Sequence, residues 1–305
     1  MKRFPSTLTV NDLGDTPDAN VGDGFCKDAA NKCTLRAAIM EANSTAVQAC
    51  APLTINFSVT GVIDLATALP ALNHPNLTVN GPGADQLTVR RNAVGLFRIF
   101  QINVGKTVNL AGLTLTNGDV GSGGDGGGIK NSGTLTITNC AVTGNHANGG
   151  GGIFNDGALT MTGSTLSGNS SIFDGGGLFT RDPGNANLTN CTISGNQAAS
   201  GGLGVGGILN VVFSPASSAL QLTNCTVANN TSLAPGNASG IETTGAPATT
   251  SLRNTIIANN SVPNMTAQFG GAFISLGNNL ASDNGGGFLN AVGDQINTNP
   301  LLAAL

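Results

Sequence analysis

The sequence has no tryptophan and no tyrosine, and charged residues make up only 9% of its 305 positions. Ordinary globular chains carry roughly 25% charged residues. The 12 Lys and Arg residues form no cluster, which excludes the basic footprint that nucleic-acid binding requires. No stretch approaches the ~20 apolar residues of a membrane-spanning helix. The scarcity of aromatic rings also disfavours sugar sites, which usually stack on such rings.

What the chain does contain is glycine and enough apolar surface for a long core. It has 45 Gly and 40% hydrophobic residues, with a net charge of −4. This composition excludes disorder caused by low hydrophobicity and high charge. Glycine provides the backbone freedom that a chain needs when it turns repeatedly.

An imperfect repeat dominates residues 126 to 260. Each unit opens on a glycine-rich segment such as Gly126-Gly127-Gly128-Ile129 and closes on asparagine. The closing residues lie 24 to 34 positions apart and are Asn145, Asn169, Asn196, Asn230 and Asn260. Repeats of this length are typical of solenoids, in which each coil contacts only its neighbours.

Alternation within each unit predicts strands. In Thr134-Leu135-Thr136-Ile137-Thr138, the Leu and Ile side chains point one way and the Thr side chains the other. Three short strands per unit, and no 3.6-residue period, predict an all-β, right-handed parallel β-helix. We expect an N-terminal cap over residues 1–51, coils from about Pro52 to about Asn260, and a C-terminal cap over 261–305. The C-terminal segment can be a lid over the last coil or a docking edge for a partner strand.

One helix is expected, from Thr34 to Asn43. Thr34 is a suitable N-cap, and Leu35, Ala38, Ile39 and Ala42 form an apolar face at helical spacing. An amphipathic helix just before a solenoid would cover the exposed core of the first coil.

The six cysteines fall into two groups. Cys26 and Cys33 flank a short polar loop and predict a disulfide, with zinc as the competing interpretation. Cys50 is either free or the true partner of one of them. The other three occupy one repeat position, shared with Ser164 and Thr255, which predicts a buried ladder of small residues: Cys140, Cys191 and Cys225.

These residues resemble known families. The segments Asp18–Cys26 and Cys33–Asn43 closely resemble the CSLREA domain of exported bacterial β-helix proteins, here with Cys-Thr-Leu-Arg-Ala-Ala as the signature. Asn254–Asn260, Leu276–Leu280 and Gly293–Leu302 resemble the choice-of-anchor Q domain, and the glycine repeats are similar to those of polymorphic outer-membrane proteins. The resemblance implies export and surface exposure rather than a particular reaction.

Catalysis, if present, has few candidate residues. Asp125 and Asp174 each precede three glycines, two coils apart, with Arg181 and Asp182 on the following loop. Two coil rises of ~4.8 Å separate the two carboxylates by roughly 10 Å, near the spacing of inverting glycosidases. The intervening coil places Asn148 near that position, and both Asp residues can instead cap turns. Three carboxylates, or a basic side chain facing carboxylates, in one groove would favour the enzyme.

Two histidines and a row of asparagines have structural alternatives. His74 and His146 lie on polar turns without an acid nearby in the sequence. Four asparagines occupy one bend of the repeat, where Gly163 replaces them in one unit. They predict a hydrogen-bonded ladder between coils or, alternatively, a sugar-binding row: Asn139, Asn190, Asn224 and Asn254.

Two functional classes follow from these features. The first is an exported structural or adhesive protein, at the cell surface or extracellular and non-catalytic, which presents loops and has itself or surface glycans as its partner. The second is a carbohydrate-active enzyme or carbohydrate-binding module. The start Met1-Lys2-Arg3-Phe4-Pro5-Ser6 has no apolar segment behind its basic residues, so any export signal is expected to have been removed.

The N-terminal acidic loop predicts calcium binding, because its oxygen-bearing side chains alternate with glycines as in loops that wrap Ca²⁺. The expected ligands are Asp12, Asp15, Asp18, Asn20 and Asp23. Calcium that binds only the folded state should raise the melting temperature as its concentration rises. An unchanged melting temperature after chelation and readdition of millimolar calcium would remove the site from consideration.

Overall fold

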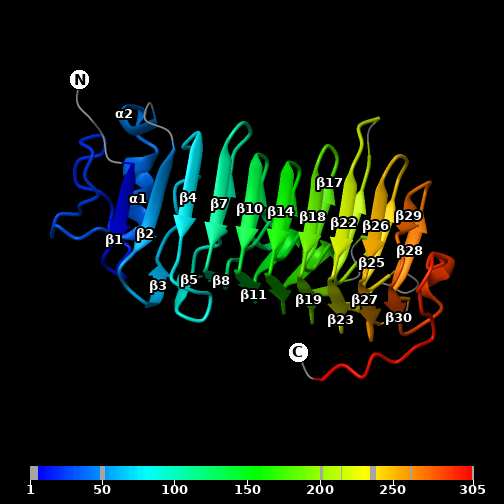
Figure 1. Ribbon diagram of the computed structural model, residues 1–305. Helices are drawn as coiled ribbons and strands as arrows, with labels where there is room; N and C mark the ends of the chain where they lie inside the picture. Colours follow the sequence, from blue (N-terminus) through cyan, green and yellow to red (C-terminus); the bar gives the residue numbers. More distant parts are fainter. Residues whose placement is uncertain are drawn as a thin grey trace.

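The computed structural model describes residues 6–48, 52–199, 202–213, 215–233, 238–261 and 263–303. These form a right-handed parallel β-helix in which successive coils stack side by side along one axis (Figure 1). The predicted fold class is therefore confirmed. Cys50 lies outside the described residues, as do residues 1–5.

Two long sheets carry most of the solenoid. The ten-stranded sheet consists, in spatial order, of β1 (Thr7–Val10), β2 (Leu53–Phe57), β4 (Asn76–Asn80), β7 (Thr107–Ala111), β10 (Thr134–Thr138), β14 (Ala158–Thr162), β18 (Asn185–Thr189), β22 (Ala219–Thr223), β26 (Thr249–Arg253) and β29 (Ala272–Ser275). The nine-stranded sheet consists of β3 (Gly61–Leu65), β5 (Leu87–Arg91), β8 (Thr114–Thr116), β11 (Ala141–Thr143), β15 (Thr165–Ser167), β19 (Thr192–Ser194), β23 (Thr226–Ala228), β27 (Ile256–Ala258) and β30 (Leu280–Ala281).

Two further sheets complete the coils. The seven-stranded sheet contains, from the N-terminal coil onward, β6 (Phe100–Ile102), β9 (Ile129–Asn131), β13 (Ile153–Asn155), β17 (Leu178–Arg181), β21 (Ile208–Val211), β25 (Ile241–Thr244) and β28 (Met265–Gln268). The four-stranded sheet contains β12 (His146–Gly149), β16 (Ser170–Asp174), β20 (Gln197–Ala198) and β24 (Thr231–Ser232). This fourth sheet was not expected, and it places His146 on a strand rather than on a turn.

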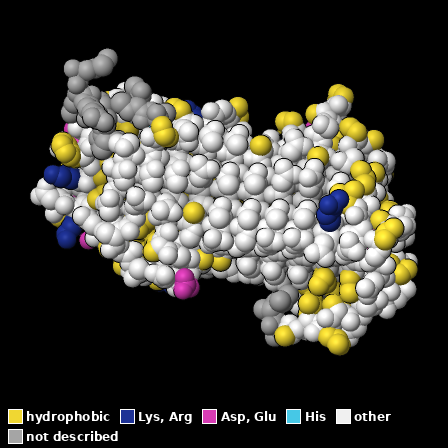
Figure 2. Space-filling view, in the orientation of Figure 1, with side chains coloured by type: hydrophobic (Ala, Val, Ile, Leu, Met, Phe, Trp, Pro, Cys, Tyr) yellow, Lys and Arg dark blue, Asp and Glu magenta, His cyan; other side chains and the backbone are white. Residues whose placement is uncertain are grey.

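Alternation explains the core. Leu135 and Ile137 are buried and pair in register with Leu159 and Met161 on the next coil, whereas the intervening Thr136 faces outward. The outer face of the ten-stranded sheet is consequently uncharged over most of its length (Figure 2). The buried side chains form one continuous hydrophobic cluster along the axis.

The solenoid extends further than predicted at both ends. In the expected N-terminal cap, β1 pairs with β2 because Leu8 and Val10 alternate inward in the same register. Past Asn260, three strands continue the sheets, namely β28, β29 and β30.

A helix covers the N-terminal end, as expected. Helix α1 (Leu35–Ala42) begins at Thr34, whose side chain accepts a hydrogen bond from the Ala37 amide at 3.0 Å, and ends at Asn43. A second short helix, α2 (Thr45–Gln48), follows. Arg36 anchors α1 to the first coil, because it pairs with Asp15 at 2.9 Å and donates to the backbone oxygens of Thr67 and Ala68 at 2.7 Å.

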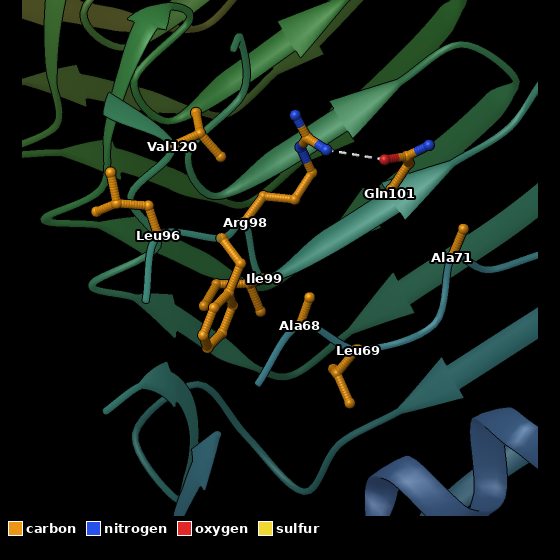
Figure 3. A pocket seen from close by; sticks show the side chains of 9 residues that line it. Ala68, Leu69, Ala71, Leu96, Arg98, Ile99, Gln101 and Val120 are labelled. Atoms are coloured by element: carbon orange, nitrogen blue, oxygen red, sulfur yellow. Dashed lines mark hydrogen bonds between the residues drawn. The ribbon is translucent and has the colours of Figure 1, made fainter. Parts of the chain in front are cut away.

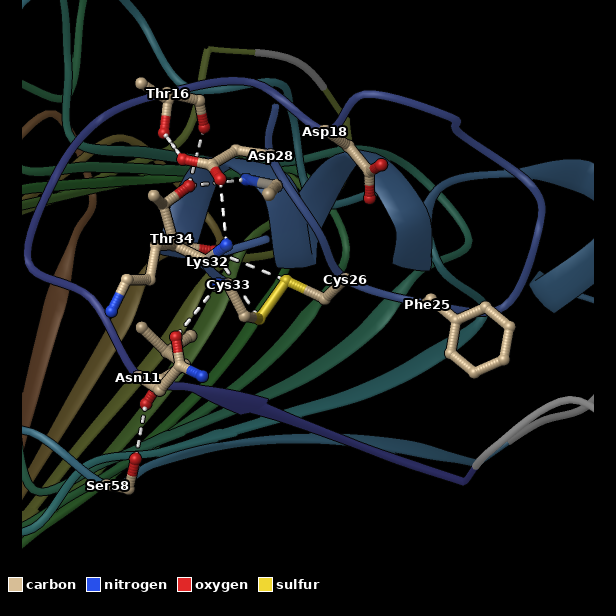
Figure 4. Close-up of a disulfide and its surroundings, with 12 residues drawn as sticks. Asn11, Thr16, Asp18, Phe25, Cys26, Asp28, Lys32, Cys33, Thr34 and Ser58 are labelled. Atoms are coloured by element: carbon tan, nitrogen blue, oxygen red, sulfur yellow. Dashed lines mark hydrogen bonds between the residues drawn. A yellow bond between two sulfur atoms is a disulfide. The ribbon is translucent and has the colours of Figure 1, made fainter. Parts of the chain in front are cut away.

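The predicted disulfide between Cys26 and Cys33 is confirmed (Figure 4). The disulfide closes a short loop. Asp28 also stabilises this loop, because its carboxylate accepts hydrogen bonds from the amides of Ala30 and Lys32. These hydrogen bonds hold the pKa of Asp28 below its usual value, the largest contribution coming from the Thr16 hydroxyl. The remaining cysteines of the repeats are free and buried, in agreement with the predicted ladder: Cys140, Cys191 and Cys225.

Two asparagine ladders run along the axis. The predicted one lies at a bend where each residue has a left-handed backbone, with side chains bonded between coils, as from Asn254 Nδ2 to Asn224 Oδ1 at 2.8 Å. A second, buried ladder consists of the repeat-closing residues Asn145, Asn169, Asn196, Asn230 and Asn260. Each Oδ1 of Asn169, Asn196 and Asn230 accepts from both the backbone and the side chain of the preceding ladder residue.

The C-terminal segment folds over the last coil as a lid. Leu289 is buried in the main core, and Phe288 stacks on Phe273 with ring centroids 4.8 Å apart. Asp294 accepts from the Asn279 amide at 2.9 Å and so extends the coil contacts. A 3₁₀ turn (η2, Gly285–Gly287) lies within this lid. A second one (η1, Gly121–Gly123) precedes β9.

Replacing Asn169 by Ala should lower the free energy of unfolding by roughly 3 kcal/mol, since buried donors on Asn145 and the Val142 carbonyl lose their partner. The control is Asn224→Gly, which keeps the left-handed backbone on the exposed ladder and should change stability by less than about 1 kcal/mol. Urea unfolding of both variants measures the difference. Equal losses would show that the buried ladder has no special role.

Candidate functional site

The predicted acids Asp125 and Asp174 lie at the corner between the four-stranded and the seven-stranded sheets. After Asp125, Gly149 and Asp174, three glycines turn the chain from one sheet to the other. The first glycine of each turn has a left-handed backbone, with φ of 72° at Gly126, and a Cβ there would approach the Ile129 carbonyl oxygen to 2.4 Å. Only glycine fits, so the preceding residue occupies the same place on every coil. We call Asp125, Gly149 and Asp174 the corner row.

In the corner row, Gly149 lies between two carboxylates. Gly149, not Asn148 as expected, is the partner in register of Asp174. The reason is a register shift between Ala147 and Gly149, which gives β16 an extra residue. Asn148 instead lies beside Asp125, with its Nδ2 3.5 Å from Oδ1. The two acids are two coils, or roughly 10 Å, apart. The Phe179 ring packs over Gly149 between them, since a Cβ at Gly149 would lie 2.7 Å from its Cδ1 and 3.3 Å from Asp125 Oδ1.

Asp174 is the more enclosed of the two acids. Its Oδ1 accepts a hydrogen bond at 3.0 Å from the amide of Gly204, which lies between β20 and β21. Burial raises the pKa of Asp174 above its usual value, and the charge of Asp125 adds to this effect. Asp174 therefore holds a proton more readily than an ordinary aspartate does.

A second hydrophobic cluster forms the floor beside the corner row, outside the solenoid. It lies on the outer face of the seven-stranded sheet and consists of Phe154, Phe179, Val205, Leu209 and Val211. The rings of Phe154 and Phe179 meet edge to face with centroids 5.3 Å apart. The sequence signal was the pair of adjacent apolar residues in three of these strands, Ile153-Phe154, Leu178-Phe179 and Ile208-Leu209, which a strand buried on one face alone does not need.

Basic side chains lie on the same floor. Lys130 Nζ is 5.5 Å and Arg181 Cζ 4.8 Å from the Phe154 ring centroid. Arg181 also faces Asp156 at 3.7 Å. Asp182 does not join this group, because its Oδ1 accepts the amide of Phe213 on the next coil.

Arg98 brings a third basic group toward the corner row. It borders a cavity of about 180 Å³, where its Nη1 donates to Gln101 at 2.8 Å (Figure 3). Its Nη2 donates to the Asp125 backbone oxygen at 3.2 Å. Burial lowers the pKa of Arg98, whereas the negative charge of Asp125 raises it.

Glu242 is an unexpected acid on this face. It pairs in register with Leu209, is fully buried, and accepts a hydrogen bond from Thr266 Oγ1 at 3.0 Å. Its other oxygen, Oε1, has no hydrogen-bond partner within the described part of the chain. Burial raises the pKa of Glu242 to about 7, with a smaller contribution from the charge of Asp174.

An apolar pocket of about 510 Å³ continues the face beyond Asp174. Phe213 and Phe269 border it and are 73% and 81% exposed. Gly245 also lines it, where a Cβ would approach the Val212 carbonyl oxygen to 2.1 Å. Thr244 and Asp174 are its polar lining.

The acidic N-terminal loop is not arranged as a metal cage. Among the described residues, no group of three or more His, Cys, Asp or Glu side chains is placed to hold a metal ion. Asp12, Asp18 and Asp23 accept amide hydrogen bonds within their own turns, while Asp15 pairs with Arg36. Glu41 of α1 accepts the amides of Gly22 and Gly24 and so holds this loop against the helix. Calcium binding stays a prediction that would need the loop to rearrange.

The Glu242→Gln variant should be more stable than the wild type above pH 7. Glu242 has a pKa near 4.5 when unfolded and about 7 when folded, so the folded protein binds this proton more tightly between those values. Wild-type stability should therefore fall as the pH rises through this window, by roughly 3 kcal/mol in total. Melting curves from pH 4 to 8 test this, with Asp85→Asn at an exposed acid as the control. Identical pH profiles for wild type and Glu242→Gln would contradict it.

Comparison with solved structures places the fold among known solenoids. Pectate lyase Pel9A matches with a TM-score of 0.58 and 13% identity, over 92% of this chain and 71% of that protein. ORF18 of Geobacillus virus E2 matches with a TM-score of 0.52 and 12% identity, over 90% of this chain and 51% of that protein, so the chain spans about half its length. At these identities the likeness shows the fold alone. No curated protein sequence matches the chain.

The family described as "Right handed beta helix region" matches residues 99–298. That span is about two thirds of the chain and includes the whole corner row. The chain therefore belongs to the right-handed β-helix family.

Proposed function

We propose that this protein is an exported carbohydrate-active β-helix that binds an acidic polysaccharide along the outer face of the seven-stranded sheet and hydrolyses it at the corner row. The observation that carries the proposal is the corner row, with Asp125 and Asp174 on either side of Gly149 and the cations of Lys130 and Arg181 over the Phe154 ring on the adjacent floor. Support for an enzyme comes from Arg181, a basic side chain that faces the Asp156 carboxylate at 3.7 Å on this floor. Export is supported by the disulfide, which persists in oxidising compartments.

The two acids take different roles in this proposal. Asp174, with its raised pKa, protonates the leaving oxygen, and Asp125 activates a water molecule on the opposite side of the sugar ring. A separation of roughly 10 Å leaves room for that water molecule, as inversion requires. Hydrolysis then needs no covalent intermediate.

The substrate class follows from charge and shape. Lys130 and Arg181 offer cations to the carboxylates of a uronic-acid chain, and the fold is shared with a protein named as a pectate lyase. Phe213 and Phe269 offer exposed rings for the apolar face of a sugar next to Asp174. A chain that runs along the solenoid axis would contact all of these residues.

A second candidate is a non-catalytic, adhesive surface protein that holds the same glycan. It is favoured by the hydrogen bond from the Gly204 amide to Asp174, which gives that carboxylate a structural role as a turn cap. No helix in the described residues is long and apolar enough to cross a membrane. Because the lid covers the last coil, glycan binding supports this candidate better than end-to-end self-association at that end.

Binding and reducing-end release on polygalacturonate and alginate test the proposal. The double variant Lys130→Ala/Arg181→Ala should bind polyuronides about tenfold more weakly, the equivalent of roughly 1.4 kcal/mol. Asp174→Asn should keep binding and lose about 100-fold or more of the hydrolytic rate.

The matched control is Arg253→Ala, at an exposed base on the ten-stranded sheet, which should change neither quantity. Binding without release of reducing ends by the wild type would support the adhesive protein instead. Equal binding by the wild type and the Lys130→Ala/Arg181→Ala variant would contradict the proposed face.

A further inference from the structure

Three polar residues lie in one row on the outer side of the four-stranded sheet and its neighbouring bridge. Asp119 pairs with His146, and His146 pairs with Ser170, on three successive coils. Residues in register on parallel strands point to the same side and are ~4.8 Å apart. We call them the Asp119–His146–Ser170 row. In the sequence they are 24 to 27 residues apart, which is why His146 showed no acid nearby.

The buried asparagine ladder holds this row in place. The residues that precede His146 and Ser170 are the ladder residues Asn145 and Asn169, and Gly118 precedes Asp119 at the equivalent place. The Gly118 amide donates to Asn145 Oδ1 at 2.8 Å, and the Asn145 amide donates to Asn169 Oδ1 at 3.0 Å. Because these bonds fix the backbone one residue upstream, the three side chains keep their spacing.

His146 and Ser170 are already in contact. His146 Nδ1 lies 2.8 Å from Ser170 Oγ. With its proton on Nε2, the imidazole accepts the serine hydroxyl proton at Nδ1, and this is the relation of base to nucleophile in covalent hydrolases. Both side chains are partly exposed, so a substrate can reach them.

Asp119 stands on the other side of His146. Its Oδ1 accepts the Gly121 amide at 2.8 Å, and its Oδ2 lies 3.7 Å from Arg91 Nη2. The Gly121 amide and Arg91 thus hold the Asp119 carboxylate on the coil next to His146, and both residues line the same pocket.

A pocket of about 320 Å³ opens beside His146. Its lining is polar and includes Arg91, Asn92, Asn117, Asp119 and His146. The pocket has the size of a small polar group such as a sugar unit. It provides a place for the alcohol portion of a substrate next to the serine–histidine pair.

We propose that Ser170 and His146 form a nucleophile–base pair that hydrolyses a carboxylic ester of a sugar, with Asp119 as a positioning residue. Ser170 Oγ attacks the ester carbonyl carbon while its proton passes to His146 Nδ1. The ester C–O bond breaks, and the sugar alcohol leaves with that proton. Water, deprotonated by His146, then attacks the acyl-serine and releases the carboxylic acid and free Ser170. The choice of a sugar as the alcohol part of the substrate rests on the proposed function, whereas the hydrolysis of an ester does not.

Two assays that need no polysaccharide test the serine–histidine pair. A fluorophosphonate probe should label Ser170, identified by peptide mapping, and the wild type should hydrolyse p-nitrophenyl acetate. Ser170→Ala and His146→Ala should each reduce hydrolysis by about 100-fold or more. The control Ser251→Ala, at a partly exposed serine on the ten-stranded sheet, should keep the wild-type rate and labelling.

The role of Asp119 has its own readout. Asp119→Asn should lower kcat for p-nitrophenyl acetate and leave KM nearly unchanged, while the protein keeps its β circular dichroism, because a positioning residue acts on the chemical step rather than on substrate binding. A wild type that is unlabelled at Ser170, or whose rate equals that of Ser170→Ala, would overturn the proposal. Retention of polyuronide binding in Ser170→Ala separates this outcome from failure of the proposed function.

Discussion

The buried asparagine ladder is the interaction on which the rest of the molecule depends. Each carboxamide of Asn169, Asn196 and Asn230 donates to a backbone carbonyl of the preceding coil and to the next asparagine, and accepts from the preceding one. A single side chain therefore ties together three coils. Buried polar groups are costly unless all their hydrogen bonds are made, so this ladder allows only one register between neighbouring coils.

A fixed register lets the coils differ in length without disturbing their chemistry. The loop that carries Leu203 and Val205 leaves the helix after β20 and folds onto the outer face of the seven-stranded sheet. The ten-stranded sheet keeps in-register pairing through the same coils. The longer loop at this corner thus packs against Phe154 and Phe179 on the regular strands. Meanwhile the ladder keeps the corner row and the Asp119–His146–Ser170 row aligned.

The sequence was sufficient for features that depend on local pattern. Alternation in Thr134–Thr138 and the repeated Asn residues predicted the solenoid, Thr34 predicted the start of the helix, and the spacing of Cys26 and Cys33 predicted the disulfide. Pairings across coils were predictable where the repeat is regular, as in the two ladders, but not at the corner row, because there they depend on the register between residues 24 to 34 positions apart. One extra residue in β16 was enough to place Gly149, rather than Asn148, between Asp125 and Asp174. The full burial of Glu242 is likewise not visible in its local sequence, where it alternates with apolar and polar residues on a short strand.

Native-state hydrogen exchange of the ladder amides tests the central claim most directly. The backbone amides of Asn145, Asn169 and Asn196 donate to buried carboxamides rather than to strand carbonyls. If the ladder fixes the register, these amides should exchange only through global unfolding, as slowly as the inner strand amides of β10 and β14. Exchange as fast as that of an exposed loop amide such as that of Val94 would contradict the account.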